Sequence, residues 1–350
     1  MFQDTGRKAS RFTAFKAAGS AAMLAIAIAV SGCSTAPATD GASAATSSVA
    51  TKPITKGQKI VMATHSFNVF VGPTRASARV PGSVDSPGPL AALAAERGKA
   101  GHETLGVQMI GGSTPMQHWN QGDGDDTKNI AKAALTAGGA NVDVFTMSPN
   151  ARMPEDGIDH FGDFVIAHNP NARIMVQNSW SAYDGHGSTA SVGGSGGGDF
   201  KNADRDNTTL AEVDGWLKSQ NAAGGYLERL RTQLDGIDKR AGHQITYVVP
   251  SAAAVYALRR EVIQGHVPGV AKQSEMHRDP IGHPTTPTAH VVTYVWYAAM
   301  YRESPVGLKA LVDAADPTSA QREKLLQEIA WNAVVAEPKS GVKGKQVKLG

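Results

Sequence analysis

Short apolar runs alternate with longer segments of helical periodicity through the body of the chain, from residue 59 onward. Runs that are rich in Val, Ile and Met and lack regular polar positions are typical of strands buried on both faces of a sheet. Five such runs are predicted as strands: Lys59–Thr64, Thr104–Ile110, Val142–Met147, Arg173–Gln177 and Gln244–Val248.

The segments between and after these runs carry apolar residues at helical spacing. Strands and helices that alternate along most of a chain predict an α/β fold, with a parallel sheet covered by helices on both faces. The glycine-rich stretch 184–206 predicts a surface loop after the fourth strand. The predicted helices are Pro89–Gly98, Asp126–Ala137, Asp156–His168, Thr208–Lys239, Ser251–Ile263, Pro287–Arg302, Pro305–Ala314 and Ser319–Val335.

The first 33 residues have the pattern of a bacterial targeting segment. Basic residues precede an apolar run from Ala17 to Val30, which is shorter than the roughly 20 residues that span a bilayer and suits a secretory signal. The sequence Val30-Ser31-Gly32-Cys33 resembles a lipobox, which implies a lipoprotein signal peptide over 1–32 and a lipid anchor on Cys33 in the cell envelope. An ordinary signal peptide with an incidental Cys, or an uncleaved anchor, is the alternative.

Composition divides the rest of the chain. Residues 33–57 are mostly Ala, Ser, Thr and Pro and predict a flexible tether, followed by one domain over 58–335 and a C-terminal tail over 336–350. The chain has a single Cys, which excludes an internal disulfide. Its net charge of +3 comes from the first 32 residues, where four basic residues face one acidic residue, so the near-neutral body argues against a nucleic-acid partner.

Polar residues that follow the predicted strands are candidates for an active site. Ligands of open parallel sheets bind beyond the carboxyl ends of the strands. Ser66 follows the first strand, Gly112 the second and Asn150 the third, whereas His283 with Asp279 follows the last strand and a helix. Such a set could work as nucleophile, oxyanion donors, base and orienting acid. The alternative is that Ser66 only caps the helix that follows the first strand.

This order of residues resembles the SGNH (GDSL-like) hydrolase superfamily over roughly 59–308. The most specific part of the match is the stretch after His283, which consists of Thr293–Tyr301 and the following Ser304-Pro305-Val306-Gly307-Leu308. The resemblance implies a flavodoxin-like three-layer α/β/α sandwich with a mostly parallel five-stranded sheet. It also implies Ser66 as nucleophile, His283 as base and Asp279 as its acid. The oxyanion donors would be the backbone N–H groups of Ser66 and Gly112, with Gly111 as a close alternative, and the Asn150 amide. No cofactor or metal is implied.

The chain departs from the family pattern at three places. His65 stands where the family has Asp or Asn before the nucleophile. Asp279 lies four residues before His283 instead of three, and the third block around Asn150 lacks the usual Gly-x-Asn-Asp spelling. His65 either lines the pocket or packs at the end of its strand.

Three further features complete the sequence-based picture. His65, Trp119 and Trp180 follow strand ends and are candidates for binding substrate. The acidic segment 123–126 faintly resembles a calcium loop, but a solvated loop before a helix N-terminus explains it better. We therefore expect a lipid-anchored serine esterase whose substrate is a small-molecule or carbohydrate ester, with an O-acetyl group as one candidate. The alternative is a non-catalytic ligand-binding lipoprotein with the same fold; the sequence does not indicate the oligomeric state.

Overall fold

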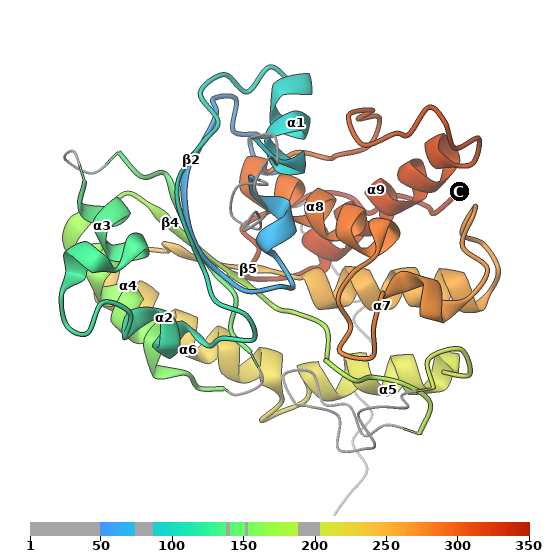
Figure 1. Cartoon of the computed structure of the whole chain (residues 1–350), viewed down its shortest axis with the longest axis horizontal. Helices are drawn as coiled ribbons and strands as arrows, with labels where there is room; N and C mark the ends of the chain where they lie inside the picture. Colours follow the sequence, from blue (N-terminus) through green and yellow to red (C-terminus); the bar gives the residue numbers. More distant parts are fainter. Residues whose placement is uncertain (1–49, 74–86, 138–140, 151–152, 188–203) are drawn as a thin grey trace, which may run out of the picture. The chain divides into compact units, whose positions relative to one another are not determined.

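Five parallel strands form one sheet in the computed structural model, which describes residues 50–73, 87–137, 141–150, 153–187 and 204–350 (Figure 1). The strand order β2-β1-β3-β4-β5 is the flavodoxin-like order. Every neighbouring pair is parallel. The strands are β1 (Lys59–Thr64), β2 (Glu103–Met109), β3 (Val144–Met147), β4 (Arg173–Gln177) and β5 (Thr246–Val249). The predicted fold class, and with it the fold that the SGNH resemblance implies, is confirmed.

Helices cover both faces of the sheet, as parallel strands require (Figure 1). Helices α1, α7, α8 and α9 pack together on one face, and α2, α3, α4 and α6 lie on the other, while α5 contacts both α6 and α7. Their bounds are α1 (Pro89–Glu96), α2 (Pro115–Trp119), α3 (Ile130–Thr136), α4 (Asp156–His168), α5 (Leu210–Asn221), α6 (Tyr226–Ala241), α7 (Ser251–Ile263), α8 (Thr286–Tyr301) and α9 (Ser319–Ala336). The 3₁₀ turns are η1 (Val69–Val71), η3 (Asp126–Lys128) and η4 (Gln273–Met276).

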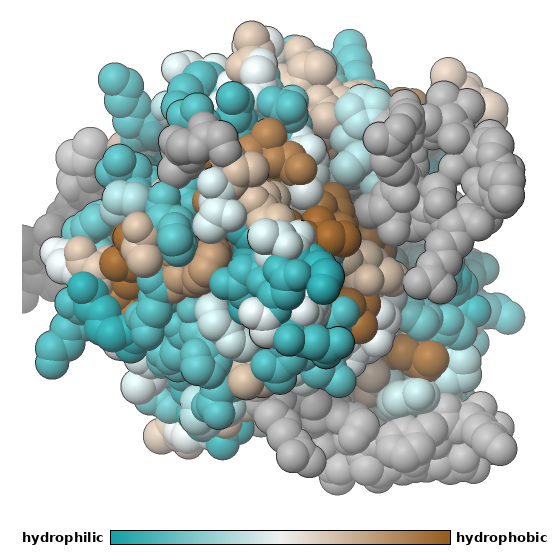
Figure 2. Space-filling view, turned by 60° about the vertical axis from the view of Figure 1, so that its left-hand side comes forward, coloured by the Kyte–Doolittle hydropathy of each residue, from teal (hydrophilic) through white to brown (hydrophobic). Residues whose placement is uncertain are grey.

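Few large apolar side chains are exposed on the described surface. Figure 2 shows one side on which hydrophilic residues prevail and apolar residues form small patches. The large apolar residues that are exposed are Leu105, Met109, Ile130, Ile281 and Val347. In the part of the chain that the structure describes, no helix combines the length and the apolar character that crossing a membrane requires.

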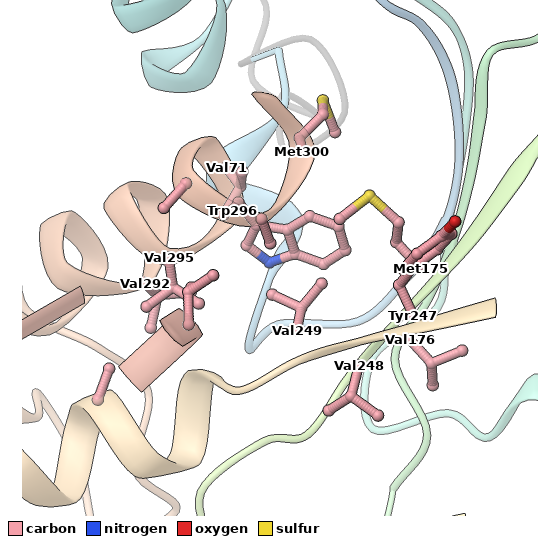
Figure 3. Close-up of a cluster of buried hydrophobic side chains, with 14 of the residues drawn as sticks. Val71, Met175, Val176, Tyr247, Val248, Val249, Val292, Val295, Trp296 and Met300 are labelled. Carbon is pink, nitrogen blue, oxygen red and sulfur yellow. The ribbon is translucent and has the colours of Figure 1, made fainter. Parts of the chain in front are cut away.

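Helix α8 forms the centre of the core on its side of the sheet. Every residue from Val291 to Tyr301 is buried, because the helix lies among the sheet, α1, α7 and α9. Figure 3 shows the Trp296 ring of α8 beside Val249 and Met175 of the sheet. Its indole N–H donates to Gln177 Oε1 at 2.7 Å, so the one polar atom of this ring is paired.

Two of the predicted helices are wrong at places where glycine interrupts the helical pattern. The predicted helix over Thr208–Lys239 is two helices, because Gly224 has φ +72° and a Cβ at Gly225 would lie 2.4 Å from the Ser219 carbonyl oxygen. The segment predicted as a helix over Pro305–Ala314 consists of turns, with Gly307 at φ +90°. Within Asp126–Ala137, η3 is separated from α3 by Asn129, whose side chain caps α3.

The body is wider than the predicted range 58–335. In the expected tether, the Ile54 N–H donates to the Tyr301 carbonyl at 2.8 Å. In the expected tail, the Lys339 carbonyl accepts from the Val248 N–H of β5 at 3.0 Å. The described residues around Ile54 and Lys339 therefore belong to the folded unit. The predicted signal segment, Cys33 and the rest of the expected tether up to residue 49 lie outside the described residues.

Candidate active site

A cavity of about 710 Å³ opens at the carboxyl ends of the strands, where the sequence predicted a site. Segments that follow β1, β2, β3 and β4 line it, together with α6 and the loop before α8. The lining residues are His65, Ser66, Phe67, Met109, Gly111, Gly112, Pro149, Asn150, Ser179, Trp180, Ser181, Ala182, Tyr183, Tyr226, Ile281 and His283.

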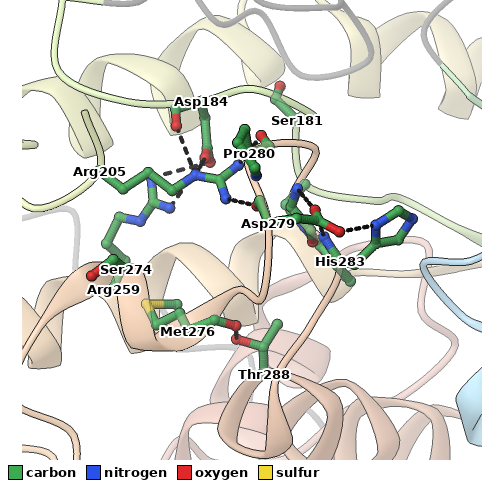
Figure 4. Close-up of polar contacts among 12 residues, drawn as sticks. Ser181, Asp184, Arg205, Arg259, Ser274, Met276, Asp279, Pro280, His283 and Thr288 are labelled. Carbon is green, nitrogen blue, oxygen red and sulfur yellow. Dashed lines mark hydrogen bonds and ion pairs between the residues drawn. The ribbon is translucent and has the colours of Figure 1, made fainter. Parts of the chain in front are cut away.

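Ser66, His283 and Asp279 form a continuous hydrogen-bonded relay at this cavity. The Nε2 atom of His283 lies 2.9 Å from Ser66 Oγ, and Nδ1 lies 2.6 Å from Asp279 Oδ2. Figure 4 shows the Asp279 carboxylate directed at the His283 ring. The structure thus brings together three side chains that the sequence had predicted as a set. Ser66 is not a helix N-cap, since Asn68 holds that position before η1.

The turn from Asp279 to His283 explains how a four-residue spacing brings acid and base together. Asp279 Oδ1 accepts the backbone N–H groups of Gly282 at 3.1 Å and His283 at 3.2 Å. Gly282 has φ +102°, a conformation that favours glycine. The carboxylate therefore folds back over its own turn, and Oδ2 remains directed at the His283 ring.

The same contacts keep Asp279 ionised. Partial burial favours the neutral acid, but the hydrogen bonds from the side chain and backbone of His283 and from the Gly282 N–H outweigh it. The pKa of the Asp279 carboxyl is consequently lower than usual. An ionised acid beside Nδ1 favours the tautomer that carries its proton there and leaves Nε2 free to accept.

Gly112 and Asn150 lie together on the cavity wall. The Asn150 side-chain amide donates to the Gly112 carbonyl at 2.8 Å. Gly112 has φ +62°, a backbone conformation that would be strained in a residue with a side chain. Because an amide carries two N–H donors, Asn150 can hold this turn and still offer one donor to a ligand. Gly111, the close alternative to Gly112, also lines the cavity.

His65, at the end of β1, is both packed and at the cavity wall. Its Nδ1 accepts the Phe67 N–H at 3.3 Å, and its Nε2 lies 2.9 Å from Ser148 Oγ. Burial lowers the pKa of His65 to about 4, so the ring is neutral at pH 7. With Nδ1 as acceptor, Nε2 carries the proton and donates to Ser148. His65 is therefore an uncharged side chain that connects the Phe67 N–H with the Ser148 hydroxyl. It occupies the position before the nucleophile, where the family pattern has Asp or Asn.

A series of buried polar groups continues from His65, and one of them, Ser179, lines the cavity. Ser148 Oγ lies 3.4 Å from Ser179 Oγ, which accepts from Gln177 Nε2 at 2.8 Å. Gln177 Oε1 accepts from Trp296 and from Ser251. The sequence does not predict these contacts of Ser148, Ser179 and Gln177, because isolated polar residues at strand ends have no local pattern that separates them from loop residues.

Trp180 and Phe67 form the aromatic wall beside His283. Their rings stack with centroids 4.5 Å apart, and the Phe67 ring meets the His283 ring edge-on at 5.8 Å. The Trp180 indole N–H donates to the Gly282 carbonyl at 2.9 Å. Trp180 thus lies at the cavity, where the sequence placed it, and contacts the turn that carries His283.

Trp119 lies away from the cavity, which corrects its placement from sequence. Helix α2 starts at Pro115, soon after β2, and turns the Trp119 side chain onto α4. There it stacks on His160 with centroids 5.1 Å apart, and the Lys132 ammonium lies 3.6 Å above the ring. Packing and a cation–π contact account for this side chain.

The acidic segment before η3 behaves as a helix start. Asp125 Oδ1 accepts from the backbone and the hydroxyl of Thr127, and Asp126 pairs with Lys132. Among the residues that the structure describes, no group of three or more His, Cys, Asp or Glu side chains is arranged to hold a metal ion.

Comparisons with known proteins found only distantly similar solved structures. No family model and no curated protein matches the chain. It is similar to the crystal structure of a DUF4886 family protein from Bacteroides uniformis, with 12% identity, a TM-score of 0.47, and coverage of 83% of this chain and 98% of that one. For a protein assigned as a GDSL-like lipase from Parabacteroides merdae, the identity is 10%, the TM-score 0.39 and the coverage 69% and 95%. For a gut microbial diltiazem-metabolizing enzyme, the identity is 13%, the TM-score 0.34 and the coverage 71% and 47%.

Proposed function

We propose that this protein is a serine ester hydrolase of the SGNH type. The observation that carries the proposal is the relay from Asp279 through His283 to the Ser66 hydroxyl at a ligand-sized cavity. A weak hydroxyl nucleophile needs a base within hydrogen-bond reach and a third group that orients the base. Ser66 has both.

The reaction follows from these positions. His283 Nε2 takes the Ser66 proton as Oγ attacks the ester carbonyl, and the negative charge that develops on the carbonyl oxygen faces the backbone N–H groups of Ser66 and Gly112 and the Asn150 amide. The alcohol leaves with the proton from His283. Water then gives a proton to His283 and attacks the acyl group on Ser66, which releases the carboxylic acid and restores the hydroxyl.

The cavity chemistry favours an uncharged ester. None of the described residues that line it is Lys, Arg, Asp or Glu, and aromatic side chains form much of its wall. Met109 and Ile281, which are 39% and 38% exposed, also line it, and such apolar exposure suits an apolar ligand group. A carbohydrate O-acetyl ester stays a candidate within this class.

Hydrolysis of p-nitrophenyl acetate tests the proposal. Ser66→Ala is expected to lower kcat/KM by on the order of 10³-fold or more, and His283→Ala by nearly as much, because such residues act as a unit. The matched control is Ser113→Ala. Ser113 also contacts a histidine ring, His118, at 2.7 Å, but it is 1% exposed and is not among the cavity-lining residues.

The outcomes separate enzyme from binding protein. Loss in Ser66→Ala with activity retained in Ser113→Ala supports the esterase. Equal rates for wild type and Ser66→Ala overturn it, and ligand binding without turnover would favour the non-catalytic alternative.

We also propose that Cys33 carries a lipid that holds the protein at a membrane of the cell envelope. The lipobox-like sequence before Cys33 supports this proposal. Cys33→Ser is expected to release the protein from the membrane fraction or to leave it unprocessed. A processed protein that stays with the membrane after this substitution would contradict lipid anchoring.

A further inference from the structure

The side chain of Arg205 contacts the turn that carries Asp279 from outside the cavity (Figure 4). Arg205 comes shortly before α5 and lies 74 residues before Asp279 in the sequence. One terminal nitrogen of its guanidinium donates to the Asp279 carbonyl at 2.6 Å, and the other donates to the Pro280 carbonyl at 2.8 Å. Two consecutive carbonyls of the turn therefore share one planar donor group.

The guanidinium is itself fixed by a buried carboxylate. Arg205 Nε donates to the Asp184 carbonyl at 3.0 Å and to Asp184 Oδ1 at 3.1 Å. Asp184 is fully buried and also pairs with Arg259 of α7 at 3.1 Å. The carboxylate thus ties Arg205 to a core helix, which leaves the guanidinium little freedom to follow a moving turn.

Arg205 has no direct access to substrate. Its side chain is 5% exposed, and it is not among the residues that line the cavity. It packs behind the turn, where a Cβ on Gly282 would lie 3.2 Å from one of its terminal nitrogens. Any effect on the reaction must pass through the turn.

We propose that Arg205, anchored by Asp184, is a positioning residue that holds the turn so that Asp279 Oδ2 reaches His283 Nδ1. The inference rests on the proposed esterase function and adds a residue outside the relay. All five guanidinium donors lie in one rigid plane, which suits two adjacent carbonyls and a carboxylate at once. A lysine ammonium on a flexible stem cannot reproduce this set of contacts.

A double-mutant cycle with Asp279 tests the inference. We would measure kcat and KM for p-nitrophenyl acetate with wild type, Arg205→Met, Arg205→Lys, Asp279→Asn and the double variant Arg205→Met/Asp279→Asn. Displacing the turn by about 1 Å is expected to lower kcat by 10- to 100-fold in Arg205→Met, with little change in KM. Arg205→Lys is expected to recover little of this loss.

The double variant is decisive, because the effects of two substitutions on kcat are not additive when both residues act through the same group. If Arg205 acts through Asp279, the double variant should have a kcat less than threefold below that of Asp279→Asn alone. Losses that multiply, or a wild-type kcat in Arg205→Met, would overturn the inference. An inactive wild type would instead reject the esterase proposal itself.

A second buried arginine controls for a general loss of stability. Arg322 is also buried, pairs with Asp316 and donates to the Pro268 carbonyl at 3.3 Å, away from the turn. Arg322→Met is expected to lower the melting temperature with kcat within about twofold of wild type. An equal fall in kcat for both arginine variants contradicts a specific role for Arg205, and if Arg205→Met does not fold, a normal kcat in Arg205→Lys contradicts it too.

Discussion

His283 has a separate partner for each ring nitrogen, Asp279 for Nδ1 and Ser66 for Nε2. This pairing assigns the tautomer: Nδ1 donates to the ionised carboxylate, and the lone pair of Nε2 faces the hydroxyl proton. Ser66 and His283 could be predicted because each belongs to a short motif. The contact of His65 with Ser148 could not, since those two residues meet only through the sheet.

At the same scale, Asn150 can be tested as an oxyanion donor. Asn150→Asp keeps the shape of the side chain but replaces its N–H donors with a carboxylate oxygen. We expect kcat to fall by about 10²–10³-fold, with a smaller change in KM, because the lost donor acts mainly in the transition state. Steady-state kinetics with p-nitrophenyl acetate measures both values.

Tyr226→Phe is the matched control for Asn150. The Tyr226 hydroxyl donates to the Asn150 carbonyl at 3.3 Å and lines the same cavity, but it supplies none of the proposed oxyanion donors. We expect this variant to retain kcat within a fewfold of wild type. An Asn150→Asp enzyme with normal kcat would remove the amide from the mechanism.

Among the elements, some could be predicted with the bounds that the structure shows. Helices α4 and α7 and strands β1 and β4 have the bounds that the sequence predicted. The failures lie at turns, because Gly224 and Gly307 adopt positive φ values that interrupt an otherwise helical pattern. The turn from Asp279 to His283 belongs to the same class: the sequence shows its residues but not its hydrogen bonds.

Gly282→Ala tests that turn directly. A Cβ here would meet Arg205 at 3.2 Å and the Trp180 indole nitrogen at 3.3 Å, in a backbone at φ +102°. We expect kcat to fall at least tenfold as the turn shifts. Gly265→Ala is the control, because Gly265 also has positive φ (+73°) but a Cβ there has open space. Both variants should lose about 1 kcal/mol or more of folding free energy, and only Gly282→Ala should lose activity. Equal kcat values in the two variants would contradict the role of the turn.

For the whole molecule, buried histidines predict how stability depends on pH. Burial lowers the pKa of His118 from 6.5 to about 4. Between these values the unfolded chain binds a proton that the folded protein does not, so stability falls as the pH is lowered from about 6.5 towards 4. The slope is about 1.4 kcal/mol per pH unit for each such histidine.

Urea unfolding at pH 7 and pH 5 checks this prediction. Wild type should lose about 2 kcal/mol more stability between these pH values than His118→Gln does. His243→Gln, at an exposed position, is the matched control for the loss of a histidine. If wild type and His118→Gln had the same pH dependence of stability, His118 would accept a proton as readily in the folded protein as in the unfolded chain, which contradicts the prediction.

The layered fold of the molecule could be predicted because strand and helix patterns alternate. The range of the folded body could not, since the segments around Ile54 and Lys339 are polar in sequence and join the body through backbone hydrogen bonds.

Covalent labelling of Ser66 tests the central claim most directly. A fluorophosphonate reacts with a serine hydroxyl only when a base activates it, and mass spectrometry of the digested protein locates the adduct. We predict one phosphonyl group on the peptide that contains Ser66 in wild type, and none on that peptide in Ser66→Ala or, over the same time, in His283→Ala. Adduct on another serine with Ser66 unmodified, or labelling at the wild-type rate in His283→Ala, would contradict the account.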